Sequence, residues 1–326
     1  MAMPSPLPVR DGVGATRLHL PLTGEWDSIA EYVVDRFGHM DPEALRQRFD
    51  RGEMVTSDGS AVSRDAKIGS HEWIWYYREP PVEREIPFDV EIVHVDDDLV
   101  VIDKPHFLPT TPGGKFLQNS ALVRMRNQLG NPDLSPIHRL DRATAGLLMF
   151  SARPQTRGAY QLLFENRIVQ KTYEAVSLAP AAFDGTHLAG REFPITYRNH
   201  IEKVRASVTV LVDSKPDANS ETLIELLGVG ESRGTDRGRQ VIHTLLKPHT
   251  GRMHQLRVHL AGLGAGILND GFYPVLHPEV PDDFTRPLQL LARELEFVDP
   301  LTGEARHFQS RRTLQEAPLV PEPVAR

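Results

Sequence analysis

The stretch from His138 to Phe150 constrains this chain more than any other segment. Its first half is polar and places a carboxylate, Asp141, between two arginines, Arg139 and Arg142. Its second half, Gly146 to Phe150, is a continuous apolar run of the kind that forms a buried strand. A carboxylate mounted directly before a core strand is held rigidly, and adjacent arginines favour its ionised form. These properties suit a nucleophilic or general-base aspartate, although the same residues also fit a structural Asp–Arg pair that caps a strand.

Composition narrows the chemistry that this chain can carry out. Its 326 residues suit one large domain and one smaller domain. There is no cysteine, which excludes disulfides, thiolate catalysis and cysteine-ligated metal centres. No apolar run approaches the roughly 18 residues of a membrane helix, and the N-terminus lacks the features of a signal peptide. We therefore expect a cytoplasmic protein without a membrane span.

Charge is distributed unevenly along the chain. The net charge of −7, taken globally, argues against a protein that binds nucleic acid. However, residues 1–100 contain 20 acidic and only 10 basic side chains, so the excess of acid is N-terminal. The segments 138–171 and 233–259 each hold six basic residues, against two and one acidic residues. Both segments can therefore bind the phosphates of a nucleic acid.

Local patterns divide the chain into five parts. The predicted parts are an extended arm (1–22), a small domain (23–80), a Pro-rich linker (81–87), a large domain (88–310) and a loose tail (311–326). In the small domain we expect a helix after Trp26, a second helix after Asp41 and a tight turn at Asp58-Gly59. An aromatic strand is expected from Trp73 to Tyr77.

The large domain alternates strand and helix patterns. Helices are expected from Ser120 to Gly130 and from Gln155 to Val169, the latter with Ala159, Leu162, Leu163 and Ile168 on its apolar side. A loop rich in glycine and arginine is expected from Gly228 to Arg239. Strand patterns occur at 90–95, 99–103, 146–150, 171–176, 206–212, 222–227, 241–246 and 288–292, and a further strand is expected after Phe297.

Several motifs of the large domain resemble those of the RluA family of RNA pseudouridine synthases. Residues 138–150 are similar to the family's HRLDxxTSGLLL motif, with Ala145 in the place of serine. Residues 171–175 resemble K-x-Y-x-A, and residues 250–259 resemble TGRTHQIRVH with Met253 in the place of threonine. The motifs follow the family's order between about residues 88 and 308.

Three further segments bear on this resemblance. Asp103-Lys104-Pro105 resembles the family's NKP element, and residues 269–273 parallel a Gly-Asp-x-x-Tyr segment. Residues 110–114 depart from the His-Pro-Gly loop that members commonly carry. The small N-terminal domain resembles the S4-type RNA-binding domain, but its charge is acidic where such domains are basic.

The resemblance implies an enzyme that isomerises uridine to pseudouridine in ribosomal or transfer RNA. It implies an α+β fold with a central mixed, mostly antiparallel sheet and flanking helices, preceded by a small S4-like domain. The isomerisation involves no redox change and no group donor, so neither a cofactor nor a metal is expected. RNA is the expected partner of a monomeric protein.

Site residues follow from the same motifs. In the family the HRLD aspartate is the nucleophile, which is Asp141 here. Tyr173 is expected to lie against the base and to aid removal of a proton, and Arg257 is expected to grip Asp141 in a bidentate pair. The remaining motif residues are expected to contact the RNA: Arg139, Arg142, Lys104, Lys171, Arg252, His254, Gln255 and Leu256.

Other interpretations of the same residues remain open. A protein that retained the fold as a catalytically idle RNA-binding module would bind RNA without changing it. A glycosidase that acts on free nucleosides would need a second carboxylate near Asp141, and residues 139–150 do not supply one. Tyr173, on a strand, also fits a core tyrosine. Histidines 243, 249, 254 and 259 could suggest a metal site, but His254 and His259 are five residues apart and lack a helical zinc-binding pattern.

Overall fold

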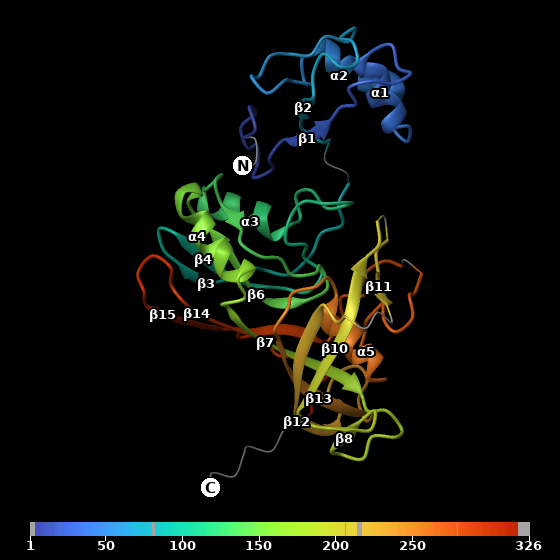
Figure 1. The fold of residues 1–326 in the computed structure, drawn as a ribbon, viewed down its shortest axis with the longest axis vertical. Coiled ribbons are helices and arrows are strands. Elements are labelled where there is room, and N and C mark those ends of the chain that lie inside the picture. The colour runs from blue at the N-terminus through green and yellow to red at the C-terminus, as the bar shows by residue number, and fades with distance from the viewer. Residues whose placement is uncertain (1–3, 80–81, 206, 214–216, 279, 319–326) are drawn as a thin grey trace. The chain divides into compact units, whose positions relative to one another are not determined.

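The computed structural model describes residues 4–79, 82–205, 207–213, 217–278 and 280–318. The chain forms two compact units, drawn in Figure 1. The smaller unit comprises Met1–Arg84, Pro112–Gln118 and Val123–Pro132, and the larger unit comprises Glu85–Thr111, Asn119–Leu122 and Asp133–Arg326. The predicted linker at residues 81–87 therefore marks only the first place where the chain passes from the smaller unit to the larger unit, and the chain passes between them again further on.

In its described N-terminal segment, the smaller unit contains a two-stranded sheet and two short helices. Strand β1 (Thr16–His19) pairs antiparallel with β2 (Trp73–Tyr76), and the helices are α1 (Ile29–Arg36) and α2 (Pro42–Asp50). Each helix begins after a side chain that accepts a hydrogen bond from the first turn, Ser28 for α1 and Asp41 for α2.

The predicted extended arm is wrong at Thr16–His19. Leu18 and Ile74 lie on the same face of the β1–β2 pair and are buried in one core with residues of both helices. The strand forms because it gives these apolar side chains a common core. The S4-like identity of the smaller unit stays a prediction.

Helix α3 (Ala121–Leu129) confirms the helix expected after Ser120, but most of it belongs to the smaller unit. Arg126 Nη1 donates to the carbonyl oxygen of Gly12 at 3.1 Å, and Asn127 Nδ2 donates to that of Asp11 at 3.1 Å. Residues 123–132 therefore fold with the N-terminal chain, although the prediction placed them in the large domain.

The described residues of the larger unit form an eleven-stranded sheet. Its order is β11-β10-β12-β13-β7-β14-β6-β4-β3, with β15 paired to β14 and β5 paired to β6. All pairs are antiparallel except β14 with β6, which confirms the predicted mixed, mostly antiparallel sheet. The strands are β3 (Glu91–Val95), β4 (Leu99–Lys104), β5 (Ser135–Pro136), β6 (Ala145–Ser151), β7 (Gln170–Leu178), β10 (Ile195–Lys203), β11 (Val210–Asp213), β12 (Ser220–Glu231), β13 (Gln240–Pro248), β14 (Leu290–Val298) and β15 (Ala305–Gln309). A separate pair is formed by β8 (His187–Leu188) and β9 (Arg191–Glu192).

Gly146 permits the parallel pairing of β6 with β14. Its φ of +110° is a conformation that L side chains rarely adopt. A Cβ atom at this position would collide with the backbone of Ala292 on β14, its partner in the strand register. The glycine of the central motif therefore lets two buried strands approach closely, five residues after Asp141.

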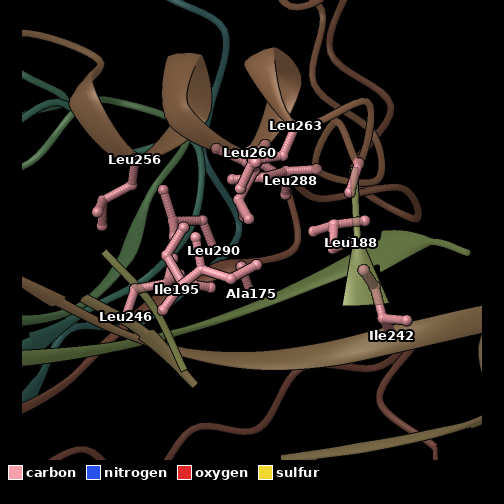
Figure 2. Close-up of a cluster of buried hydrophobic side chains, with 13 residues drawn as sticks. Ala175, Leu188, Ile195, Ile242, Leu246, Leu256, Leu260, Leu263, Leu288 and Leu290 are labelled. Carbon is pink, nitrogen blue, oxygen red and sulfur yellow. The ribbon is translucent and has the colours of Figure 1, made fainter. Parts of the chain in front are cut away.

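Helix α5 (Gln255–Gly262) packs on the sheet through a leucine cluster. Figure 2 shows Leu256, Leu260 and Leu263, from the helix and its C-terminal end, beside apolar side chains of the sheet. This packing fixes the position of the helix against the strands. In the described part of the chain no helix has the length and apolar character that a membrane crossing requires.

Helix α4 (Pro154–Glu165) is shorter than predicted and buries only part of its predicted apolar side. Leu163 is buried as predicted and Ala159 is partly buried, but Leu162 and Ile168 are each 51% exposed, and Tyr160 is buried instead. The helix ends at Glu165, so Ile168 does not continue its apolar side.

Two segments that were predicted as a loop and as a loose tail have regular contacts with the larger unit. Strand β12 continues to Glu231, which shortens the loop predicted from Gly228. Residues 311–318, predicted as the first part of a loose tail, lie on the sheet: Arg312 Nε is 3.1 Å from the buried Asp103 carboxylate, and Leu314 and Glu316 are buried. Residues 319–326 of that tail lie outside the described residues.

Candidate active site

Asp141 lies in the short connection that leads from β5 into β6. The amide of Thr144 donates to its carbonyl oxygen at 3.1 Å, which closes a turn, and all seven residues of β6 are buried. The Asp141 side chain itself is 32% exposed. The connection therefore presents an accessible carboxylate from the edge of a rigid core.

Three side chains of the segment 104–110 hold the backbone on both sides of Asp141. Thr110 Oγ1 donates to the carbonyl of Leu140 at 2.8 Å and accepts from its amide at 3.1 Å. The imidazole of His106 contacts the carbonyl of Ala143 at 2.7 Å, and the ammonium of Lys104 donates to the carbonyl of Arg142 at 3.3 Å. Thr110, in the loop that departs from the family pattern, thus has a direct role in placing Asp141.

Lys104 is buried, which differs from its predicted contact with RNA. Its residue is 0% exposed, and its ammonium also donates to the carbonyls of Pro105 and Leu108. Burial lowers its pKa to about 7, although the negative charge of Asp141 opposes this shift. Lys104 therefore stabilises the backbone at Pro105, at Leu108 and at Arg142 through hydrogen bonds to carbonyl groups.

Arg257 faces Asp141, but its bidentate partner is Asp270. Nη1 of Arg257 is 3.6 Å from Asp141 Oδ2, whereas Nε and Nη2 are 2.8 Å and 2.5 Å from the two carboxylate oxygens of Asp270. Burial acts to lower the pKa of Arg257, but the hydrogen bonds and charge of Asp270 outweigh it and raise the pKa. The prediction that Arg257 forms a bidentate pair with Asp141 is therefore wrong, because Arg257 forms that pair with Asp270.

His254 approaches Asp141 from the start of α5. Its Nε2 is 3.7 Å from Asp141 Oδ2, and its Nδ1 is 3.1 Å from the hydroxyl of Tyr273. Burial lowers the pKa of His254 although the charge of Asp141 acts in the opposite direction. The side chain is 8% exposed, and it thus forms part of the wall beside the carboxylate.

Tyr173 lies on β7, in register with Leu246 of β13 and Ala292 of β14. It packs against the leucine cluster that contains Leu256. Burial raises its pKa, and the charge of Asp141 raises it further, so the phenol is protonated at neutral pH. The Tyr173 side chain is therefore a neutral aromatic ring close enough to Asp141 for the carboxylate charge to affect its pKa.

Two of the predicted RNA contacts are structural in this fold. Gln255 is buried and joins the loop before α5 to β12: its Oε1 accepts from Thr250, and its Nε2 donates to Glu221 and Thr222. Leu256 belongs to the leucine cluster. Neither side chain is presented to solvent.

The remaining predicted contacts are accessible. Arg139 and Arg252 are exposed, and Lys171 is partly exposed. Arg142 is also partly exposed, but it makes a bidentate pair with Asp282, with distances of 2.7 and 2.8 Å. Burial lowers the pKa of Lys171.

The sequence interpretation missed four residues of the site: Thr110, His106, Asp270 and Tyr273. Asp270 and Tyr273 stood in the segment that parallels Gly-Asp-x-x-Tyr, which was the available signal for them. No local pattern pointed to the contacts of His106 and Thr110, because their partners are backbone carbonyls 37 and 30 residues further along the chain.

Donors for a metal ion occur at a different place. Glu294, Glu296 and His307, on β14 and β15, have ligand atoms within 4.8 Å of one another, and Glu296 and His307 are exposed. Exposed groups of this kind are common without an ion, and no predicted site residue belongs to this group.

Comparison with known proteins identifies the family. The family model described as RNA pseudouridylate synthase matches residues 98–262, about half of the chain and a span that includes Asp141, Tyr173 and Arg257. The chain therefore belongs to the RNA pseudouridine synthases of the RluA family, which confirms the resemblance and the enzyme class.

Individual relatives agree with this assignment. The dual-specificity RNA pseudouridine synthase RluA of Vibrio parahaemolyticus is 30% identical over 213 residues, which cover 64% of this chain and 78% of that protein. The mitochondrial tRNA pseudouridine(32) synthase of Saccharomyces cerevisiae is 27% identical over 250 residues, 75% of this chain but only half of that protein. The solved structure of human RNA pseudouridylate synthase domain containing 1 shares the fold, with a TM-score of 0.53 and 22% identity over 71% of this chain and 86% of that chain.

Proposed function

We propose that this enzyme isomerises specific uridines of ribosomal or transfer RNA to pseudouridine, with Asp141 as the nucleophile. The observation that carries the role of Asp141 is its exposure. Its side chain is 32% exposed, whereas those of Arg257, His254 and Asp270, which surround it, are 4%, 8% and 0% exposed. Among these four charged or titratable groups, Asp141 is the one that a substrate can reach.

The proposed reaction begins with attack of an Asp141 carboxylate oxygen on C1′ of the uridine. The bond between C1′ and N1 breaks, and the uracil leaves with the bonding electron pair. The base turns within the site, and its C5 forms a new bond to C1′ that displaces the carboxylate. The proton of C5 is then lost and N1 gains a proton, so the product is an isomer of the substrate. Carboxylate attack at an anomeric carbon is familiar from glycoside cleavage.

Tyr173 is proposed to contact the uracil while it turns. A neutral aromatic ring stacks on a base independently of the base's orientation. The raised pKa of Tyr173, caused first by burial, keeps this ring neutral in the resting enzyme.

The target uridine is proposed to lie in an unpaired loop. A base within a stacked helix cannot reach Asp141, and flipping costs least where the base is already unpaired. Arg139 and Arg252 are exposed, so they can bind phosphates beside the target.

The glycosidase alternative required a second carboxylate near Asp141, and folding does bring Asp270 close. However, Asp270 is fully buried and both of its oxygens accept hydrogen bonds from Arg257. It therefore cannot protonate a leaving group or activate water, which are the tasks of a second carboxylate in a glycosidase.

Mapping of pseudouridine by carbodiimide modification and primer extension tests the proposal. Ribosomal and transfer RNA transcripts are treated with the wild type, Asp141→Asn or the control Asp97→Asn, whose carboxylate is 84% exposed in the β3–β4 turn. We expect a stop with the wild type and the control, and none with Asp141→Asn, which should bind RNA within about threefold of the wild type. RNA that is bound by folded wild type but never modified would favour the idle binding module.

A further inference from the structure

Asp270 and Asp141 contact the same guanidinium, that of Arg257. It accepts hydrogen bonds from Nε and Nη2 of Arg257, and the remaining terminal nitrogen of that guanidinium, Nη1, is the one 3.6 Å from Asp141. One arginine is thus shared between a fully buried carboxylate and a partly exposed one.

The Asp270 carboxylate is itself held in place. Its Oδ1 accepts from the backbone amides of Phe272 at 2.8 Å and Tyr273 at 3.2 Å. The rings of Phe272 and Tyr273 lie 4.8 Å and 5.5 Å from the guanidinium carbon of Arg257. The turn after Asp270 therefore confines the guanidinium from a second side.

We propose that Asp270 is a positioning residue for Asp141: it grips Nε and Nη2 of Arg257 and so fixes the guanidinium with Nη1 toward the Asp141 carboxylate. This inference rests on the proposed role of Asp141 as nucleophile. The family match ends at residue 262 and does not include Asp270.

The benefit of this arrangement follows from the geometry of arginine. A guanidinium without another partner pairs with a carboxylate through two parallel hydrogen bonds, which occupy both carboxylate oxygens. Asp270 holds Nε and Nη2 along one edge of the guanidinium, and Arg257 approaches Asp141 through Nη1, which is 3.6 Å from Oδ2. A carboxylate oxygen of Asp141 then stays available for attack on C1′.

Asp299 provides a matched control. Its carboxylate is 1% exposed, lies 3.3 Å from Arg306 Nε and accepts from the amides two and three residues ahead, Leu301 and Thr302. Like Asp270, it is a buried carboxylate with an arginine contact and two turn amides, here in the β14–β15 turn, and it additionally accepts from the hydroxyl of Tyr160. Asp299→Asn therefore measures how much the loss of a buried carboxylate–arginine contact affects the stability of the fold, away from Asp141.

The test is a double-mutant cycle on single-turnover pseudouridine formation, with RNA affinity measured alongside. Asp270→Asn is expected to slow the reaction by about 10- to 100-fold, as expected for a displaced reacting group, and to change RNA affinity less than about threefold. If Asp270 acts through Arg257, then Asp270→Asn should slow the Arg257→Lys enzyme by less than about threefold. The Asp299→Asn enzyme should react like the wild type.

Two kinetic results would overturn the inference. One is an Asp270→Asn enzyme that reacts within about threefold of the wild type, and the other is a cycle in which the two effects multiply. Tyr273→Phe separates a third possibility: if removal of this hydroxyl alone reproduces the slow reaction, Asp270 acts through the turn and His254, and the inference is wrong.

Nitrogen-15 NMR of labelled arginine tests the positioning even if no RNA is modified. We expect two distinct, slowly exchanging Nη signals for Arg257 in the wild type and a shift of one of them in Asp141→Asn. In Asp270→Asn the two signals should average. Unchanged Arg257 signals in both variants would refute the positioning role, whereas expected shifts in an inactive wild type would refute the proposed function only.

Discussion

Replacing Lys104 with methionine tests whether a fully buried ammonium supports the loop that carries Asp141. Methionine has nearly the same length but neither donates a hydrogen bond nor titrates. The change removes donors to the carbonyls of Pro105, Leu108 and Arg142 at any pH. It also removes a pH-dependent contribution to the free energy of unfolding, which can be isolated.

The sign of that contribution follows from the pKa of Lys104. The pKa is about 7 in the folded protein, because of burial, against 10.5 for an ordinary lysine. Between these values the unfolded chain binds one more proton than the folded chain, so the free energy of unfolding rises with pH by up to about 1.4 kcal/mol per unit. From pH 7 to pH 9 the wild type should gain about 2 kcal/mol relative to Lys104→Met.

Urea unfolding of both proteins at pH 7 and pH 9, followed by circular dichroism, measures this difference. All three tryptophans lie at positions 26, 73 and 75 of the smaller unit, so their fluorescence would report on the wrong part of the chain. Lys247→Met is the control, because Lys247 is 46% exposed and the same substitution there removes a lysine that is not enclosed by the fold. A wild type and Lys104→Met pair whose stability difference is equal at pH 7 and pH 9 would refute the reasoning from burial.

Two further substitutions test other supports of the larger unit. Thr110→Val keeps the shape of the side chain but removes the hydroxyl that pairs with the amide and carbonyl of Leu140. We expect the free energy of unfolding in urea to fall by about 2–4 kcal/mol and pseudouridine formation to be slower. Thr110→Ser should match the wild type, and equal losses in both variants would contradict the hydrogen-bond argument. Burial acts to raise the pKa of Glu316, but hydrogen bonds from Ser232, Thr235 and Asp236 outweigh burial and lower this pKa to about 2. The ionised Glu316 carboxylate therefore stabilises the folded protein above about pH 4.5, and this stabilisation is lost as the pH falls toward 2. Glu316→Gln should therefore cost about 1–3 kcal/mol at pH 7 and speed amide hydrogen exchange in residues 232–239; unchanged exchange there would show that the loop does not depend on this carboxylate.

Local sequence patterns were sufficient for the elements whose stability depends on neighbours along the chain. The β3–β4 hairpin, helix α3 and the buried strand after Asp141 were predicted because periodicity and turn residues act over a few positions. The position of Asp141 before β6 was predicted for the same reason. Its nucleophilic role came from the resemblance of several motifs and stays a proposal.

Tertiary structure decided which groups lie around Asp141 and in what state. Lys104 is a basic residue in the sequence, and only the fold encloses it, with its ammonium hydrogen-bonded to the carbonyls of the nearby Pro105 and Leu108 and of the distant Arg142. Arg257 was expected to grip Asp141, but Asp270, 13 residues further along the chain, holds its other nitrogens. The energy of a charged side chain depends on burial and on partners brought together by folding, so these contacts could not be predicted from local patterns.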